Sequence, residues 1–115
     1  MNMKKVEAII RQSKFEEVKA ALHEVGVTFF THWDVTGVGQ ENADYLDVKS
    51  SEKAKMTTVK SYLSIIVNDD FEAVTIKAIM EAACTEQIGD GRIFVSTIDE
   101  AYKIRAKEKG NKTLR

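Results

Sequence analysis

The stretch KKVEAIIRQSKFEEVKAALHEVG (residues 4–26) predicts a strand followed by a helix. Its first residues place Val6, Ala8 and Ile10 on one face, and the short length of this run and its β-branched residues favour a strand. Ser13 is expected to cap the helix that follows, and the final glycine is expected to end it. The apolar residues of this helix recur at helical spacing: Phe15, Val18, Ala21, Leu22 and Val25.

A third strand and a second helix are predicted between residues 59 and 84. Val59 to Val67 (VKSYLSIIV) is typical of a strand, and Asn68 can cap a helix across DDFEAVTIKAIMEAAC. The β-branched and aromatic run from Val27 to Val38 predicts another strand, and Ile93 to Thr97 predicts a fourth. The apolar stripe predicted for the second helix consists of Phe71, Val74, Ile76, Ile79, Met80 and Ala83.

The resulting order is strand, helix, strand, strand, helix, strand over one domain of residues 1–115. It predicts an α+β, ferredoxin-like βαββαβ fold, with an antiparallel sheet and both helices on one face. Apolar residues on the open face would need a partner chain, which favours an oligomer. The segment 98–115 has few apolar anchors and is expected to fray.

Composition narrows the class of protein. The chain has 115 residues, 43% hydrophobic and 30% charged, with a formal net charge of -1, which gives no general attraction for nucleic acid or anionic membrane. No apolar run is long enough to span a bilayer, and no signal core opens the sequence, so a cytoplasmic location is expected. The single cysteine, Cys84, fits a reducing compartment and is expected to pack within the second helix. His23 and His32 lack metal-ligand spacing.

Two pairs of glycines mark candidate binding loops. They are Gly37-Val38-Gly39 at the end of the second strand and Gly89-Asp90-Gly91-Arg92 before the fourth. Glycines let backbone N–H groups approach an oxyanion, and Arg92 could place a forked cation on a phosphate. Lys103 and Arg105, expected to alternate on an extended segment, could complete a polyphosphate clamp. The plainer interpretation is a tight turn and a solvated strand end.

The segment Thr85 to Val95, TEQIGDGRIFV, resembles the C-terminal signature of the PII nitrogen-regulatory family. The stretch of residues 4–26, the DVTGVG segment and the KIR segment also match that family in order and spacing. The resemblance covers Met3 to Arg105. It implies a homotrimer that binds ATP or ADP in clefts between subunits, with AMP as a further candidate ligand, and it does not decide whether Mg²⁺ binds as well.

The resemblance assigns the nucleotide site residue by residue. Residues 85–92 would form the B-loop around the phosphates, with Lys103 and Arg105 reaching in from the neighbouring subunit. Family members usually carry Lys at Arg92 and Arg at Lys103, and both exchanges keep the charge. The implied nucleotide-binding residues are Gly37, Gly39, Thr85, Gly89, Asp90, Gly91, Arg92, Lys103 and Arg105.

The polar segment of residues 39–58 takes the place of the family's T-loop, the arm that docks onto targets. A loop of this length in a compact domain tends to be functional or disordered. The tyrosine that some members carry at the modification site aligns with Lys53, and Tyr45 lies elsewhere, so control by uridylylation is doubtful. The family glutamine that helps hold Mg-ATP and 2-oxoglutarate falls at Glu41, beside Gln40.

Glu41 would repel a dicarboxylate. The family lysine that pairs with 2-oxoglutarate is present as Lys60, but one cation does not restore the lost amide. The sequence therefore predicts weakened 2-oxoglutarate sensing.

The leading hypothesis is a regulator, not an enzyme, that controls a membrane transporter or a metabolic enzyme through its T-loop, with no role in nucleic-acid binding or membrane insertion. An alternative is a PII-like sensor of bicarbonate or of another adenine nucleotide. A second class is a ferredoxin-like phosphohydrolase, for which the sequence offers no evident base. A third is a trimeric scaffold or metal-tolerance protein of similar fold, which would bind no nucleotide.

Overall fold

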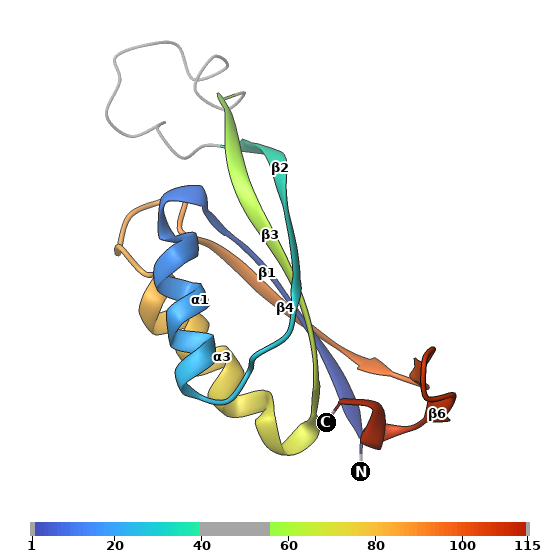
Figure 1. The fold of residues 1–115 in the computed structure, drawn as a ribbon. Helices are drawn as coiled ribbons and strands as arrows, with labels where there is room; N and C mark the ends of the chain where they lie inside the picture. Colours follow the sequence, from blue (N-terminus) through green and yellow to red (C-terminus); the bar gives the residue numbers. More distant parts are fainter. Residues whose placement is uncertain (1, 40–55, 115) are drawn as a thin grey trace, which may run out of the picture.

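The computed structural model describes residues 2–39 and 56–114, and it confirms the ferredoxin-like order (Figure 1). The sheet has the order β2-β3-β1-β4 and every neighbouring pair is antiparallel. The main elements are β1 (Met3–Arg11), α1 (Phe15–Glu24), β2 (Thr31–Gly39), β3 (Met56–Asn68), α3 (Glu72–Ala83) and β4 (Gly91–Ile98).

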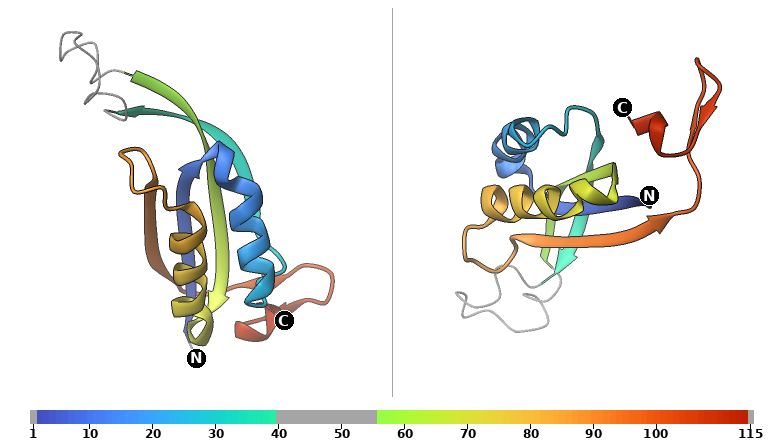
Figure 2. Two further views of the ribbon diagram at one scale, coloured as in Figure 1. Left: turned by 90° about the vertical axis from the view of Figure 1, so that its left-hand side faces the viewer. Right: turned by 90° about the horizontal axis from the view of Figure 1, so that it is seen from below.

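Both helices pack side by side on one face of the sheet (Figures 1 and 2). The alternation predicted for β1 is observed, because its even-numbered residues from Val6 to Ile10 are buried and the odd-numbered ones face away from the helices. Burial of each large apolar side chain contributes about 1.5–3 kcal/mol. The largest fully buried apolar side chains are Ile10, Leu22, Leu63, Ile65, Ile79, Val6 and Val18.

The predicted helix caps are wrong. Ser13 lies inside a short 3₁₀ helix (Gln12–Lys14), and Asn68 precedes another (Asp69–Phe71). Neither 3₁₀ helix, nor α1 or α3 after them, shows a side-chain capping bond. The chain enters each helix through a tighter 3₁₀ turn, so Ser13, two residues before α1, and Asn68, four residues before α3, do not cap the first free N–H groups. The Oδ1 atom of Asn68 is buried without a hydrogen-bond partner among the described residues.

The apolar stripe predicted for α3 is only partly correct. Ile79 and Ala83 are buried as expected, whereas Val74 and Met80 are 41% and 57% exposed. Thr75 takes a core position instead, since its hydroxyl donates to the Phe71 carbonyl at 2.7 Å. A periodic pattern of apolar residues does not predict that a polar residue such as Thr75 will be buried.

Cys84 does not pack in the core. The helix ends at Ala83, and Cys84 is extended and exposed, with its N–H still donating to the Met80 carbonyl at 3.2 Å. The expectation of a buried thiol failed because the predicted helix included Cys84, whereas the observed helix ends one residue earlier.

Several strand limits differ from the prediction. β2 begins at Thr31 rather than Val27, although Val27 is itself buried against the core. β3 begins at Met56, so the last residues of the predicted loop of 39–58 belong to a strand, as does Gly39 at its other end. The remainder of that loop, with Gln40, Glu41, Tyr45 and Lys53, lies outside the described residues.

The C-terminal segment is ordered, contrary to the expected fraying. It forms a small hairpin of β5 (Tyr102–Lys103) and β6 (Glu108–Lys109), then a 3₁₀ helix (Asn111–Leu114) that contacts β3. The Gly110 N–H donates to the Ala101 carbonyl at 2.9 Å and closes the hairpin. Backbone bonds, rather than apolar anchors, hold this segment in place.

Residues 2–39 and 56–114 contain neither a membrane-spanning helix nor a cluster of metal ligands. Their helices are too short and polar for any to cross a membrane. Within the same ranges, no three His, Cys, Asp or Glu side chains gather as a metal-ligand group.

Candidate phosphate-binding loop

The B-loop connects α3 to β4 at the end of the sheet where β1 finishes. Antiparallel pairing sets Ile10 opposite Gly91, so Arg11, the last residue of β1, lies directly beside the loop. On its other side β1 pairs with β3, and Arg11 stands opposite Lys60. Two cations are therefore placed next to the loop by strand register alone.

Asp90 is the hub of the loop. Its Oδ2 accepts from the backbone N–H groups of Thr85 (2.7 Å) and Glu86 (3.0 Å), and its Oδ1 accepts from the Thr85 hydroxyl and from Arg11 Nε at 3.0 Å. Desolvation by itself would raise the pKa of Asp90. The bonds from the Thr85 side chain and backbone, Arg11 and the Glu86 backbone outweigh it and hold this pKa well below its usual range. Asp90 is thus an ionised carboxylate, and the hydrogen bonds that its two oxygens accept hold the conformation of the loop.

Two loop carbonyls are held by cations of the sheet. Arg11 Nη2 donates to the Ile88 carbonyl at 2.8 Å, and Lys60 Nζ donates to the Gly89 carbonyl at 2.6 Å. Lys60 is only 5% exposed, so this contact keeps a nearly buried positive charge at the site. The sequence had placed Lys60 near a carboxylate ligand, and the structure shows it bonded to the B-loop.

The glycines of the candidate site differ in how strictly the backbone geometry requires glycine at each position. Gly91 has φ +106°, and a Cβ there would lie 1.7 Å from the Ile9 carbonyl oxygen. Gly89 also has φ +106°, in the region that side chains rarely adopt. At Gly37 a Cβ would approach the Lys60 Cγ to 3.3 Å, and at Gly39 it would meet open space. Backbone geometry therefore requires glycine within the B-loop more strictly than on β2.

Arg92 is exposed on β4 opposite Ile9, on the open face of the sheet. Its guanidinium makes no hydrogen bond or ion pair with any residue that the structure describes. It is the last residue of the B-loop, already on β4, and remains available to an anion.

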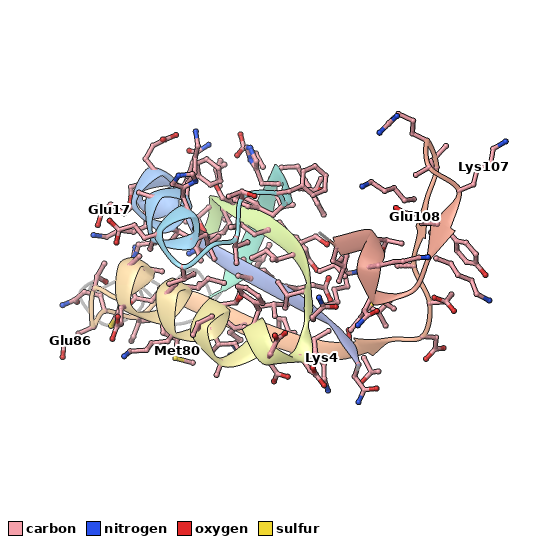
Figure 3. The ribbon with its side chains drawn as sticks, turned by 60° about the horizontal axis from the view of Figure 1, so that its bottom comes forward. Lys4, Glu17, Met80, Glu86, Lys107 and Glu108 are labelled. Atoms are coloured by element: carbon pink, nitrogen blue, oxygen red, sulfur yellow. The ribbon has the colours of Figure 1, made fainter. Side chains whose placement is uncertain are left out.

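Lys103 and Arg105 do not meet the B-loop within one chain. The predicted extended alternation is wrong, because Lys103 ends the two-residue strand β5 and Arg105 lies in the hairpin turn. Glu86 of the B-loop and Lys107 of the hairpin stand at opposite ends of the molecule (Figure 3). The hairpin therefore does not bring these cations to the loop of its own chain (Figure 3).

Sequence reasoning missed Arg11. It is 79 residues away from Asp90 along the chain, and no local motif joins them. The signal that could have found it is register, since the last residue of the first strand must face the loop that opens the fourth.

A separate aromatic cluster lies on the open face of the sheet. Trp33 stacks on Tyr62 with 4.8 Å between ring centroids, and the Tyr62 hydroxyl donates to the Glu7 carboxylate. That hydrogen bond, followed by desolvation and the Glu7 charge, raises the pKa of Tyr62. Lys5 lies 3.6 Å from the same carboxylate. One face of the Trp33 ring is therefore covered by Tyr62 within the single chain.

Comparisons with known proteins agree with this arrangement. The family model described as Nitrogen regulatory protein P-II matches residues 3–108. The chain is 38% identical over 112 residues to the P-II protein of Azospirillum brasilense, covering 97% of this chain and 100% of that one. It is 42% identical over 108 residues to the P-II protein of Bradyrhizobium diazoefficiens, covering 94% and 96%.

Solved structures show the same fold. The PII protein of Arabidopsis thaliana bound to citrate has a TM-score of 0.79 and 31% identity, covering 97% of this chain and 92% of that one. A complex of B. subtilis GlnK with ATP has a TM-score of 0.77 and 27% identity, covering 97% of each chain. Proteins of this family are regulatory signal transducers and not enzymes, which removes the phosphohydrolase alternative. With the match extending over residues 3–108, this chain belongs to the nitrogen regulatory protein P-II family.

Proposed function

We propose that this protein is a cytoplasmic, nucleotide-binding regulator that takes up ATP or ADP at its B-loop and controls a membrane transporter or a metabolic enzyme. The observation that carries the proposal is the loop built on Asp90, in which Gly89 and Gly91 both adopt φ +106°, a conformation that favours glycine. The complex of the B. subtilis relative with ATP supports the choice of ligand.

In the proposed site, Arg92 binds phosphate oxygens, and the backbone N–H groups of Ile88 and Gly89 supply further donors, since those of Thr85, Glu86 and Gln87 already bond within the loop. Gly37 and Gly39 would approach the nucleotide from β2. Lys103 and Arg105 would come from a neighbouring subunit, because in one chain their hairpin lies at the far end of the molecule (Figure 3).

A homotrimer is part of the proposal. The open face of the sheet carries exposed apolar side chains, with Trp33 44% and Phe94 49% exposed, and packing against other copies would cover them. A trimer would also supply each B-loop with the cations that its own chain cannot.

Weakened 2-oxoglutarate sensing is also proposed. Lys60 Nζ already bonds the Gly89 carbonyl at 2.6 Å, so a dicarboxylate would have to compete for that cation. The carboxylate of Glu41 would add like-charge repulsion if residue 41 lies at the ligand as the family resemblance implies. Calorimetric titrations with AMP and with Mg²⁺ will show whether either of them also binds.

Target control is assigned to residues 39–58 as the T-loop. Lys53 at the position of the modified tyrosine argues against uridylylation, and Tyr45 is displaced from it. A bound nucleotide can shift a docking segment only through different affinities for its two states, so ATP and ADP are expected to favour different partner affinities.

Calorimetric titration with ATP, ADP and AMP, each with and without Mg²⁺ and 2-oxoglutarate, tests the function. We expect about one nucleotide per subunit and little effect of 2-oxoglutarate. Arg92→Ala should weaken ATP binding about 10- to 100-fold, since a charge-assisted bond contributes about 1.5–3 kcal/mol. Lys77→Ala, which removes an exposed cation on α3, is the matched control.

Binding of bicarbonate in place of any adenine nucleotide would favour the alternative sensor. Tight, ATP-dependent uptake of 2-oxoglutarate would contradict the proposed loss of that response.

A further inference from the structure

We propose that Arg11 is a positioning residue that sets the B-loop for phosphate binding. The inference rests on the proposed nucleotide function and assigns to β1 a part in it. Arg11 is the last residue of β1, the strand at the centre of the β3-β1-β4 pairing, so its backbone is anchored on both sides.

The guanidinium of Arg11 bonds two different parts of the loop. Its Nε donates to Asp90 Oδ1 at 3.0 Å and its Nη2 donates to the Ile88 carbonyl at 2.8 Å. Both side chains of the Arg11–Asp90 pair are less than a third exposed, at 29% and 23%. Partial burial with good geometry makes such a charge-assisted pair stronger than a surface ion pair.

These bonds orient the peptide groups of the loop. In a trans peptide the N–H points opposite to the C=O, and the described chain has no cis peptide. Drawing the Ile88 carbonyl toward Arg11 therefore turns the Gly89 N–H away from the sheet. The N–H groups of Ile88 and Gly89 have no hydrogen-bond partner within residues 2–39 and 56–114. Free N–H groups beside a glycine are donors suited to a phosphate oxygen.

Arg11 also makes an acidic residue acceptable at a phosphate site. A carboxylate turned outward would repel the ligand, but Arg11 from β1 and the Thr85 and Glu86 N–H groups of the loop together engage both oxygens of Asp90. The hub is thereby neutralised and directed away from the ligand. Lys60, which faces Arg11 across the strand pair, holds the next carbonyl and completes the support.

The fork of arginine is needed for this role. Lysine presents one compact ammonium group and cannot span the Asp90 carboxylate and the Ile88 carbonyl with a rigid planar pair of donors. A conservative change should therefore weaken phosphate binding while it keeps the charge.

The test compares Arg11→Lys and Arg11→Gln with Lys19→Gln, which removes the same charge from an exposed position on α1. Calorimetry with ATP and with adenosine is combined with amide hydrogen exchange of the free protein. We expect ATP to bind about 3- to 10-fold more weakly to Arg11→Lys and about 10- to 100-fold more weakly to Arg11→Gln. Adenosine affinity should be unchanged, and the Thr85 and Glu86 amides should exchange faster.

The outcomes separate this inference from the proposed function. If wild-type protein binds ATP and both Arg11 variants bind it equally well, Arg11 is not a positioning residue. Equal losses for ATP and adenosine, with a lowered thermal midpoint, would also overturn the inference, because they indicate general loss of structure. If wild-type protein binds neither ATP nor ADP, the proposed function itself fails and the phosphate role of Arg11 fails with it.

Discussion

A methyl group added at Gly91 would collide with the neighbouring strand. The Cβ of alanine would lie 1.7 Å from the Ile9 carbonyl oxygen, 2.8 Å from the carbonyl carbon and 3.3 Å from Ile10 Cα. These are backbone atoms of the central strand, so they cannot rotate away as a side chain could. Real Cβ contacts under 3.0 Å are essentially never found, so β1 and β4 would have to separate locally by more than 1 Å.

The cost of Gly91→Ala can be built from its parts. The left-handed backbone at φ +106° costs about 1–2 kcal/mol for a residue with a Cβ. Separating the strands weakens the pairing of Gly91 with Ile10, at about 0.5–1.5 kcal/mol for each hydrogen bond. Asp90, the adjacent residue, would be drawn away from its donors. We expect the free energy of unfolding to fall by about 3–5 kcal/mol.

Two other glycines supply graded controls. Gly37→Ala brings a Cβ to 3.3 Å from Lys60 Cγ and should cost at most about 1 kcal/mol, whereas Gly39→Ala meets nothing within 4 Å and should stay within about 0.5 kcal/mol. Urea denaturation of all variants at one protein concentration measures the series, since assembly would make stability depend on concentration. A Gly91→Ala protein within 1 kcal/mol of wild type would refute the steric argument.

Three further predictions concern charge and packing. Asp90→Asn should lower the free energy of unfolding by about 2–4 kcal/mol at pH 7. Because folding depresses the pKa of Asp90 from 3.8, the difference in unfolding free energy between wild type and variant should shrink as pH falls below about 4. Urea titrations at pH 7, 5 and 3 that show a constant difference would contradict this prediction. Tyr62 should ionise above its ordinary value of 10.0 in an absorbance titration, and Glu7→Gln should lower that midpoint; an unchanged midpoint would argue against the hydrogen bond. Leu22→Ala, at a fully buried position, should cost about 2–5 kcal/mol in urea denaturation, with exposed Ala20→Gly on the same helix near 1 kcal/mol as its control.

Elements with a strong apolar period were predicted well from the sequence. The alternation around Val6 and Ala8 and the helical spacing from Phe15 to Leu22 each follow from one buried face, which is a local property. α3 was less predictable because Thr75 fills a core position through a backbone hydrogen bond. The C-terminal hairpin was missed because its order comes from backbone bonds at Gly110 and from contact with β3.

The candidate site also combines features that the local sequence predicts with features that depend on contacts between distant residues. The glycines and Arg92 are evident from their spacing, as is the presence of Asp90 among them. The task of Asp90 is not evident, since its partner Arg11 is far away in sequence and meets it only through strand register. The same register brings Lys60, which the family resemblance assigns to 2-oxoglutarate, next to the loop, where it bonds the Gly89 carbonyl.

The position of Cys84 offers a practical route to observing this protein at work. It is the single cysteine of the chain, its side chain is exposed, and it directly precedes Thr85 at the start of the B-loop. A thiol-reactive fluorophore would therefore attach at one defined place without prior removal of other cysteines. Attached there, it would sit one residue from a donor to Asp90, and its emission would report rearrangement of the loop in real time.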